Sequence, residues 1–127
     1  MLKKYKIIRF LPSFFWMFII FYFSGQQTTG IQGSYNERFV ILKSFHLIEY
    51  AVLSVLLFIG FKKFKPVIFS AYLFAVSDEI HQRFIPGREG RVRDTFIDLL
   101  GIFIGIIFIQ YLPLLIAKLS RKKNHQE

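Results

Sequence analysis

Long apolar segments are the feature of this sequence that most restricts its fold. Four of them, each about 18–24 residues long, cover residues 7–24, 43–61, 66–84 and 94–117. At roughly 1.5 Å per residue, a helix of that length crosses the roughly 30 Å hydrocarbon core of a bilayer. We therefore predict an all-α, multi-pass membrane protein, a bundle of four transmembrane helices forming a single domain over residues 1–127.

The composition favours lipid rather than water as the solvent of this chain. Its 127 residues are 54% hydrophobic and include 17 Phe, more apolar bulk than a soluble domain of this length can enclose. The absence of cysteine excludes disulfides, thiolate metal sites and cysteine nucleophiles. The net charge of +9 comes mainly from residues that flank the apolar segments, where they suit anionic headgroups. We expect membrane lipids as partners, and no nucleic acid.

The first apolar segment follows a basic start and therefore resembles a signal peptide. It ends in Phe21-Tyr22-Phe23-Ser24-Gly25, which lacks the small-x-small pattern that signal peptidases cleave. We expect this segment to be retained as the first helix of the bundle.

The distribution of Lys and Arg predicts the orientation. With four crossings, the two termini and the turn between the second and third segments share one side. That side carries eleven Lys and Arg residues: Lys3, Lys4, Lys6, Arg9, Lys62, Lys63, Lys65, Lys118, Arg121, Lys122 and Lys123. The other side carries six: Arg38, Lys43, Arg83, Arg88, Arg91 and Arg93. Because the cytoplasmic side holds the excess, we expect cytoplasmic termini in a bacterial cell membrane, with the loops at 25–42 and 83–93 facing outward.

Polar residues gather at one end of the four predicted helices. An ionisable residue inside a membrane costs roughly 2.5–3.5 kcal/mol to insert, which makes a functional role the default hypothesis. The residues in question are Ser24, Gln26, Lys43, His46, Glu49, Tyr50, Asp78, Glu79, His81, Gln82, Asp94 and Asp98. The cytoplasmic halves of the same segments are almost purely apolar. We therefore infer a polar pocket between the outer ends of the helices, covered by the loop 83–93.

Helical spacing, at roughly 100° per residue, predicts which of these residues share a face. The predicted faces are Lys43, His46 and Tyr50 in the second segment, and Asp78, His81 and Gln82 in the third, with Glu79 at the margin. Asp94 and Asp98 stand above a Gly101-x-x-x-Gly105 stripe, which would let another helix approach closely. We interpret Asp94 as the N-cap of its helix, which leaves Asp98 as the better functional candidate.

Four short motifs run through these polar segments. They are Ser24-Gly25-Gln26, Lys43-x-x-His46-x-x-x-Tyr50, Asp78-Glu79-Ile80-His81-Gln82-Arg83-Phe84-Ile85-Pro86-Gly87-Arg88 and Asp94-x-x-x-Asp98-x-x-Gly101. Together, over residues 24–105, they resemble the VanZ-like family, although that family commonly has Ser-Ser-Gln at the first motif. The resemblance implies a multi-pass protein of the cell envelope. The family's namesake is linked to low-level resistance to teicoplanin, a lipoglycopeptide antibiotic that acts at cell-wall precursors on the outer membrane face.

Ligand binding without chemistry is one interpretation of the polar pocket. In it, the pocket engages an anionic lipid-linked cell-wall precursor or glycolipid and contributes to teicoplanin resistance. Arginine suits this role because its planar fork binds phosphate or carboxylate through two hydrogen bonds. Arg88 is the foremost candidate, since the Pro86-Gly87 turn would aim it at the pocket. The proposed ligand-binding residues are Lys43, His46, Tyr50, Gln82, Arg88 and Arg93.

Two other interpretations stay open. The protein could be a membrane-embedded hydrolase or transferase acting on a lipid headgroup, with Asp78, Glu79, His81 and Asp98 as catalytic candidates that bind a metal or exchange protons. For these four residues we favour a structural role, in which Arg and Lys side chains neutralise the carboxylates. We therefore assign no metal, cofactor or enzymatic activity. The third interpretation is a structural partner in a homo-oligomer or membrane complex, suggested by the glycine stripe.

Overall fold

The computed structural model describes residues 7–88 and 90–124, and all regular secondary structure within these ranges is helical. The elements are α2 (Leu11–Ser24), α3 (Tyr35–Phe61), α4 (Phe64–Gln82), the short 3₁₀ helix η1 (Val92–Asp94) and α5 (Thr95–Asn124). The predicted topology residues Lys3, Lys4 and Lys6 lie outside the described residues.

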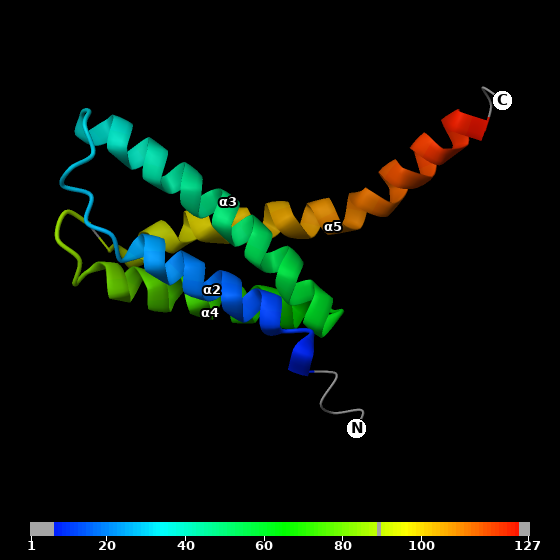
Figure 1. Ribbon diagram of the computed structural model, residues 1–127, viewed down its shortest axis with the longest axis horizontal. Coiled ribbons are helices and arrows are strands. Elements are labelled where there is room, and N and C mark those ends of the chain that lie inside the picture. The colour runs from blue at the N-terminus through cyan, green and yellow to red at the C-terminus, as the bar shows by residue number, and fades with distance from the viewer. Residues whose placement is uncertain (1–6, 89, 125–127) are drawn as a thin grey trace.

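The helices run back and forth between two ends of the bundle. Helix α4 contacts α2, α3 and α5, and α3 packs along α5. The loops at 25–34 and 83–91 lie at one end, whereas the start of α2 and the α3–α4 turn lie at the other (Figure 1). The second half of α5 extends away from the other helices (Figure 1). Polar segments that are distant in sequence therefore meet at the same end, as their positions in the apolar segments predicted.

Helix α3 begins at Tyr35, well before the predicted start at residue 43, so the predicted loop over 25–42 is wrong in its second half. The reason is a capping box. The Ser34 hydroxyl accepts a hydrogen bond from the Glu37 N–H at 3.3 Å, and the Glu37 carboxylate accepts one from the Ser34 N–H at 2.7 Å. These reciprocal bonds satisfy two backbone donors that a helix start would otherwise leave unpaired.

The other helix boundaries differ less from the prediction. Helix α2 ends at Ser24 as expected but begins at Leu11 rather than residue 7, and α4 is shifted toward the N-terminus by one turn or less. The predicted end of the last helix at residue 117 is wrong, because α5 continues through Pro113 to Asn124. Proline removes one backbone hydrogen bond and bends a helix without ending it, and the ribbon of α5 is bent along its second half (Figure 1).

Among the described residues, two stretches are long and apolar enough to cross a membrane, namely Tyr35–Phe61 and Val92–Lys118. Helix α2 is apolar but has 14 residues, a length of roughly 21 Å. Helix α4 has 19 residues and carries Lys65, Asp78 and Glu79 among them. Many large apolar side chains on α2, α3 and α5 are exposed, a surface that suits lipid better than water.

Close contact between α3 and α5 organises the interior. A Cβ atom on Gly101 would collide with the Leu47 carbonyl oxygen, and one on Gly105 would collide with the Ala51 carbonyl and the Ser54 hydroxyl. The predicted close approach at the glycine stripe is thus confirmed, and its partner is α3. Because lipid is as apolar as leucine, such packing of small residues is a main source of helix association in membranes. The buried apolar residues are Ile20, Tyr50, Leu53, Leu57, Val67, Ala71, Ala75, Ile102 and Ile106.

Candidate functional site

A chain of hydrogen bonds joins all four long helices at their polar ends. The Ser24 hydroxyl of α2 donates to Asp78 Oδ1 at 2.5 Å, and the Gln82 amide donates to Asp78 Oδ2 at 2.9 Å. The same amide nitrogen lies 3.3 Å from His46 Nε2, and His46 Nδ1 lies 3.0 Å from Asp98 Oδ1. Asp78 and Asp98 are completely buried. Residues that the sequence placed on four separate segments therefore form one connected cluster.

The donors and acceptors along this series of hydrogen bonds are consistent with one placement of the protons. The Gln82 amide has two N–H groups, so it can donate to Asp78 and to His46 Nε2 at once. His46 then accepts at Nε2 and donates from Nδ1 to Asp98, which is the hydrogen-bonding pattern of a neutral imidazole. All hydrogen bonds from Asp78 through Gln82 and His46 to Asp98 can thus form while His46 is neutral.

Lys43 supplies the positive charge at the edge of the cluster. Its Nζ atom lies 2.8 Å from Glu79 Oε1 and 3.3 Å from Asp94 Oδ2, and Arg93 Nε lies 3.8 Å from Asp94 Oδ1. Asp94, which we expected to cap the last helix, ends η1 and places its carboxylate beside Lys43. The Glu79 side chain is 0% exposed, so its charge depends on this pairing, because a buried carboxylate without a counter-charge is strongly destabilising.

The predicted face of α4 is wrong for two residues. Glu79, expected at its margin, is buried in the cluster, whereas His81 is turned toward α2. The His81 ring stacks on Phe21 with centroids 4.7 Å apart. Around the helix, Asp78 lies between Glu79 and His81, so a rotation of α4 that buries Glu79 against α3 and α5 necessarily turns His81 away. The structure does not bring His81 together with the other catalytic candidates.

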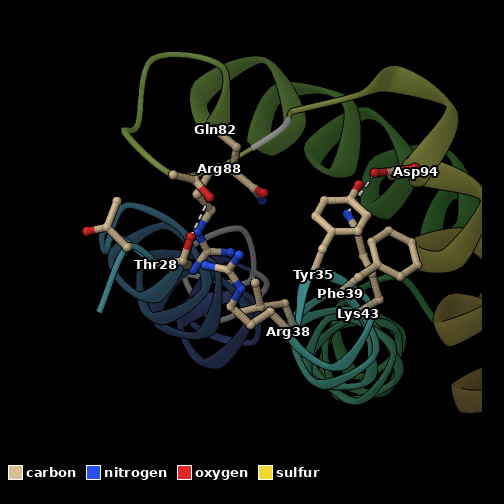
Figure 2. Close-up of a pocket in the computed structure, with 11 residues that line it drawn as sticks. Thr28, Tyr35, Arg38, Phe39, Lys43, Gln82, Arg88 and Asp94 are labelled. Atoms are coloured by element: carbon tan, nitrogen blue, oxygen red, sulfur yellow. Dashed lines mark hydrogen bonds and ion pairs between the residues drawn. The ribbon is translucent and has the colours of Figure 1, made fainter. Parts of the chain in front are cut away.

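A cavity of about 400 Å³ opens beside the cluster, between the first turns of α3 and the loops at 25–34 and 83–91. Its lining residues are Thr28, Thr29, Tyr35, Arg38, Phe39, Leu42, Lys43, Gln82, Gly87, Arg88 and Asp94. Arg38 and Arg88 are directed toward one another at one side, and Phe39 lies beside Lys43 at the other (Figure 2). Three cationic side chains thus face a cavity that has one carboxylate.

Arg88 connects the second loop to the end of α2. Its Nε donates to the Gln26 carbonyl at 3.2 Å and its Nη2 donates to the Phe23 carbonyl at 2.9 Å. The preceding Gly87 has φ +81, a conformation that favours glycine, and its carbonyl accepts a hydrogen bond from the Thr28 hydroxyl. Burial lowers the pKa of the Arg88 guanidinium from its ordinary value, although arginine stays protonated at neutral pH.

Three of the six predicted ligand-binding residues line the cavity, and the other three do not. Lys43, Gln82 and Arg88 line the cavity. His46 and Tyr50 are buried beneath it, and Arg93 has a side chain that is 71% exposed and does not line it.

Sequence reasoning missed Arg38 and Thr28 as lining residues because it assigned both to a polar loop. For Arg38, the missed signal is the capping box, Ser34-x-x-Glu37. It begins α3 early enough to place Arg38 one helical turn before Leu42, on the face that lines the cavity.

Comparison with known families covers the whole site. The VanZ/LLP1 family matches residues 9–116 of this chain. The chain belongs to the VanZ/LLP1 family. This confirms the resemblance drawn from the four motifs, and the matched region contains every residue of the cluster and cavity described above. No curated protein and no solved structure gives a significant match. Membership of the VanZ/LLP1 family and two membrane-length helices together indicate a membrane protein.

Proposed function

We propose that α2, α3, α4 and α5 all cross a bacterial cell membrane, with both termini in the cytoplasm and the cavity on the outer face. The basic turn at Lys62, Lys63 and Lys65 lies at the opposite end of the bundle from the cavity (Figure 1), as the excess of Lys and Arg on cytoplasmic loops requires. The exposed Phe14 and Phe18 on α2 support contact with lipid along that shorter helix.

The absence of native cysteine makes this topology directly testable. A single cysteine in place of Thr29 should react with a membrane-impermeant maleimide in intact cells, whereas a single cysteine in place of Lys63 should react only after the membrane is opened. The reverse pattern would refute the proposed orientation.

The cavity supports binding of an anionic, lipid-linked envelope component as the function of this protein. The observation that carries this proposal is the group of three cationic side chains, Arg38, Lys43 and Arg88, around one cavity. Arginine forks recognise phosphate groups, and Arg88 keeps N–H donors beyond the two that it uses on α2. Phe39 and Leu42 add an apolar wall, which suits a molecule with a charged headgroup and a hydrocarbon chain.

Binding would be measured with a water-soluble short-chain polyprenyl pyrophosphate and the full chain in phosphatidylcholine nanodiscs. A hydrogen bond to a charged group contributes about 1.5–3 kcal/mol, so Arg88→Gln and Arg38→Gln should each weaken binding roughly 10–100-fold. Arg93→Gln removes the same charge outside the cavity and is the matched control. Absence of saturable binding, or an equal loss in the Arg93 variant, would refute the proposal.

Two further probes identify the part of the ligand that is recognised. Inorganic pyrophosphate tests the headgroup alone, and phosphatidylglycerol tests a lipid with a single phosphate. If the cavity binds a lipid-linked pyrophosphate, the polyprenyl compound should bind more tightly than either probe, because it has both the charge and the apolar chain.

By engaging such a component, the protein would modestly lower susceptibility to lipoglycopeptides of the teicoplanin type. A deletion strain should become more sensitive to teicoplanin, and complementation should restore resistance with the wild type and Arg93→Gln but not with Arg88→Gln. Unchanged susceptibility after deletion would refute the role in resistance while leaving the binding measurement valid.

Hydrolysis or transfer of a headgroup is the second candidate function. The His46–Asp98 pair favours it, since a carboxylate bonded to one imidazole nitrogen orients the ring as a general base. The other nitrogen faces Gln82, which lines the cavity. Turnover of the polyprenyl pyrophosphate by the wild type and its loss in Asp98→Asn, with binding retained, would establish this activity, and absence of turnover would exclude it for that substrate.

A further inference from the structure

Three buried side chains from three helices converge in the polar cluster. His46 of α3, Glu79 of α4 and Asp98 of α5 each offer one ligand atom, and these atoms all lie within 4.8 Å of one another. Two ligands held about 2.1 Å from one ion are roughly 3.0 Å apart in octahedral and about 3.4 Å apart in tetrahedral geometry, and His46 Nδ1 lies 3.0 Å from Asp98 Oδ1. The separation of these side chains thus suits a shared ion as well as a hydrogen bond.

Two carboxylate oxygens in this group have no partner within the described part of the chain. Glu79 Oε2 and Asp98 Oδ2 are both buried and make no hydrogen bond, and both side chains are 0% exposed. Buried polar atoms are nearly always satisfied, and leaving one unsatisfied is costly, the more so on a charged group. The two oxygens belong to the same pair of residues whose other oxygens contact Lys43 and His46.

The charges around the cluster also favour a bound cation. Asp78, Glu79 and Asp98 carry three negative charges when ionised, and Lys43 pairs with Glu79. Asp94 sits at the edge, where Arg93 lies close to its other oxygen. The Arg88 guanidinium is directed at two backbone carbonyls. Among the described residues, Asp98 therefore has the imidazole of His46 but no Lys or Arg in contact, and a divalent cation shared with Glu79 would supply positive charge to this pair of carboxylates.

We propose that His46, Glu79 and Asp98 bind a divalent cation of the Zn²⁺ or Mn²⁺ class. One imidazole nitrogen and two carboxylate oxygens suit these ions, whereas Ca²⁺ favours six to eight oxygen ligands. Binding through Nδ1 replaces the His46–Asp98 hydrogen bond and places the imidazole proton on Nε2, so the Gln82 amide must turn its oxygen toward His46. The ion then supplies the partner that Glu79 Oε2 and Asp98 Oδ2 lack. The inference does not depend on the proposed anionic ligand, because the ion is held by residues beneath the cavity.

This cation site lies directly under the cavity. Lys43 and Gln82 both line the cavity, and they contact Glu79 and His46 of the cation site. An ion held there adds positive charge at the floor of a cavity that already has three cationic side chains. It would therefore strengthen the attraction of an anionic headgroup without contributing to the walls.

The test uses the full chain in detergent micelles, stripped with EDTA and then titrated with ZnCl₂, MnCl₂ or MgCl₂ alone. We expect one Zn²⁺ or Mn²⁺ per chain by elemental analysis, and a higher thermal unfolding midpoint, because an ion that binds only the folded state stabilises it. His46→Gln and Asp98→Asn should each weaken binding at least tenfold. His81→Gln is the matched control, because His81 stacks on Phe21 outside the proposed ligands, and it should bind as the wild type does.

A second measurement keeps the proposal testable if a variant fails to fold. Co²⁺ added to the stripped wild-type chain should produce visible absorption bands of a nitrogen- and oxygen-ligated ion, and Zn²⁺ should displace it. Loss of binding in His81→Gln equal to that in His46→Gln would refute the assigned ligands. No retained ion and no change in the unfolding midpoint with any of the three metals would overturn the site.

Discussion

Substitution of Lys43 should be far more harmful than substitution of its partner Glu79. Lys43 Nζ lies 2.8 Å from Glu79 Oε1 and 3.3 Å from Asp94 Oδ2, so the lysine has two carboxylate partners. Glu79 is completely buried and pairs with this one lysine. Lys43→Met therefore leaves a buried carboxylate without its counter-charge, whereas Glu79→Gln leaves Lys43 beside Asp94.

The structure sets the size of each effect. Breaking a buried ion pair from one side costs about 3–5 kcal/mol, which is the expectation for Lys43→Met. Glu79→Gln keeps the shape of the side chain and should cost about 1–2 kcal/mol through lost hydrogen bonding. The double variant should cost less than the two single costs added together, with a coupling energy of about 2 kcal/mol, because it removes both charges.

Free energies of unfolding would come from SDS titration of the full chain in mixed micelles, followed by the fluorescence of Trp16, the only tryptophan. EDTA is present throughout, so that a bound ion makes no contribution. Lys63→Met is the matched control, because Lys63 is exposed at the α3–α4 turn and should change stability by less than about 0.5 kcal/mol. Equal costs for Lys43→Met and Glu79→Gln, or a coupling energy near zero, would refute the reasoning.

Three further substitutions test single contacts by the same titration. Gly105→Val forces a side chain against α3 and should cost about 1–3 kcal/mol of stability. Gly30→Ala is the control, because its methyl group enters open space and should change stability by less than about 0.5 kcal/mol. Equal effects of the two substitutions would contradict the packing argument. Ser24→Ala removes the donor to a buried carboxylate and should cost about 1–3 kcal/mol, and no change would show that the bond contributes nothing. Trp16→Phe, followed by circular dichroism, removes a 2.9 Å hydrogen bond to a carbonyl of α3 and should cost about 0.5–1.5 kcal/mol.

The helices and the polar character of one end were predictable because hydropathy is a local property of the chain. Each apolar segment corresponds to one of the helices α2 to α5, and the glycine stripe indicated a close helix contact that the structure places between α3 and α5. Errors arose where a short signal was overlooked or overvalued. Ser34 and Glu37 form a capping box that is visible in the sequence and begins α3 early, and α5 continues past its predicted end at residue 117 with Pro113 inside it.

The lining of the cavity could not be predicted because it depends on how separate segments meet. Arg88 was expected to point into the pocket, and it does line the cavity while two of its nitrogens bind carbonyls at the end of α2. Arg93, five residues further along the chain, was also predicted to bind the ligand, but its side chain is 71% exposed and does not line the cavity. The sequence of the loop does not specify which groups Arg88 contacts or how exposed Arg93 is.

The sequence by itself determined that this chain forms apolar helices whose polar residues share one end, since both properties follow from residue type and position along a helix. Tertiary structure alone decided which of those residues meet. Periodicity sets the angles among Asp78, Glu79 and His81 around α4, but the rotation of α4 is set by its packing against α3 and α5. That rotation pairs Glu79 with Lys43 and leaves His81 against Phe21, because the partners of each side chain come from other helices.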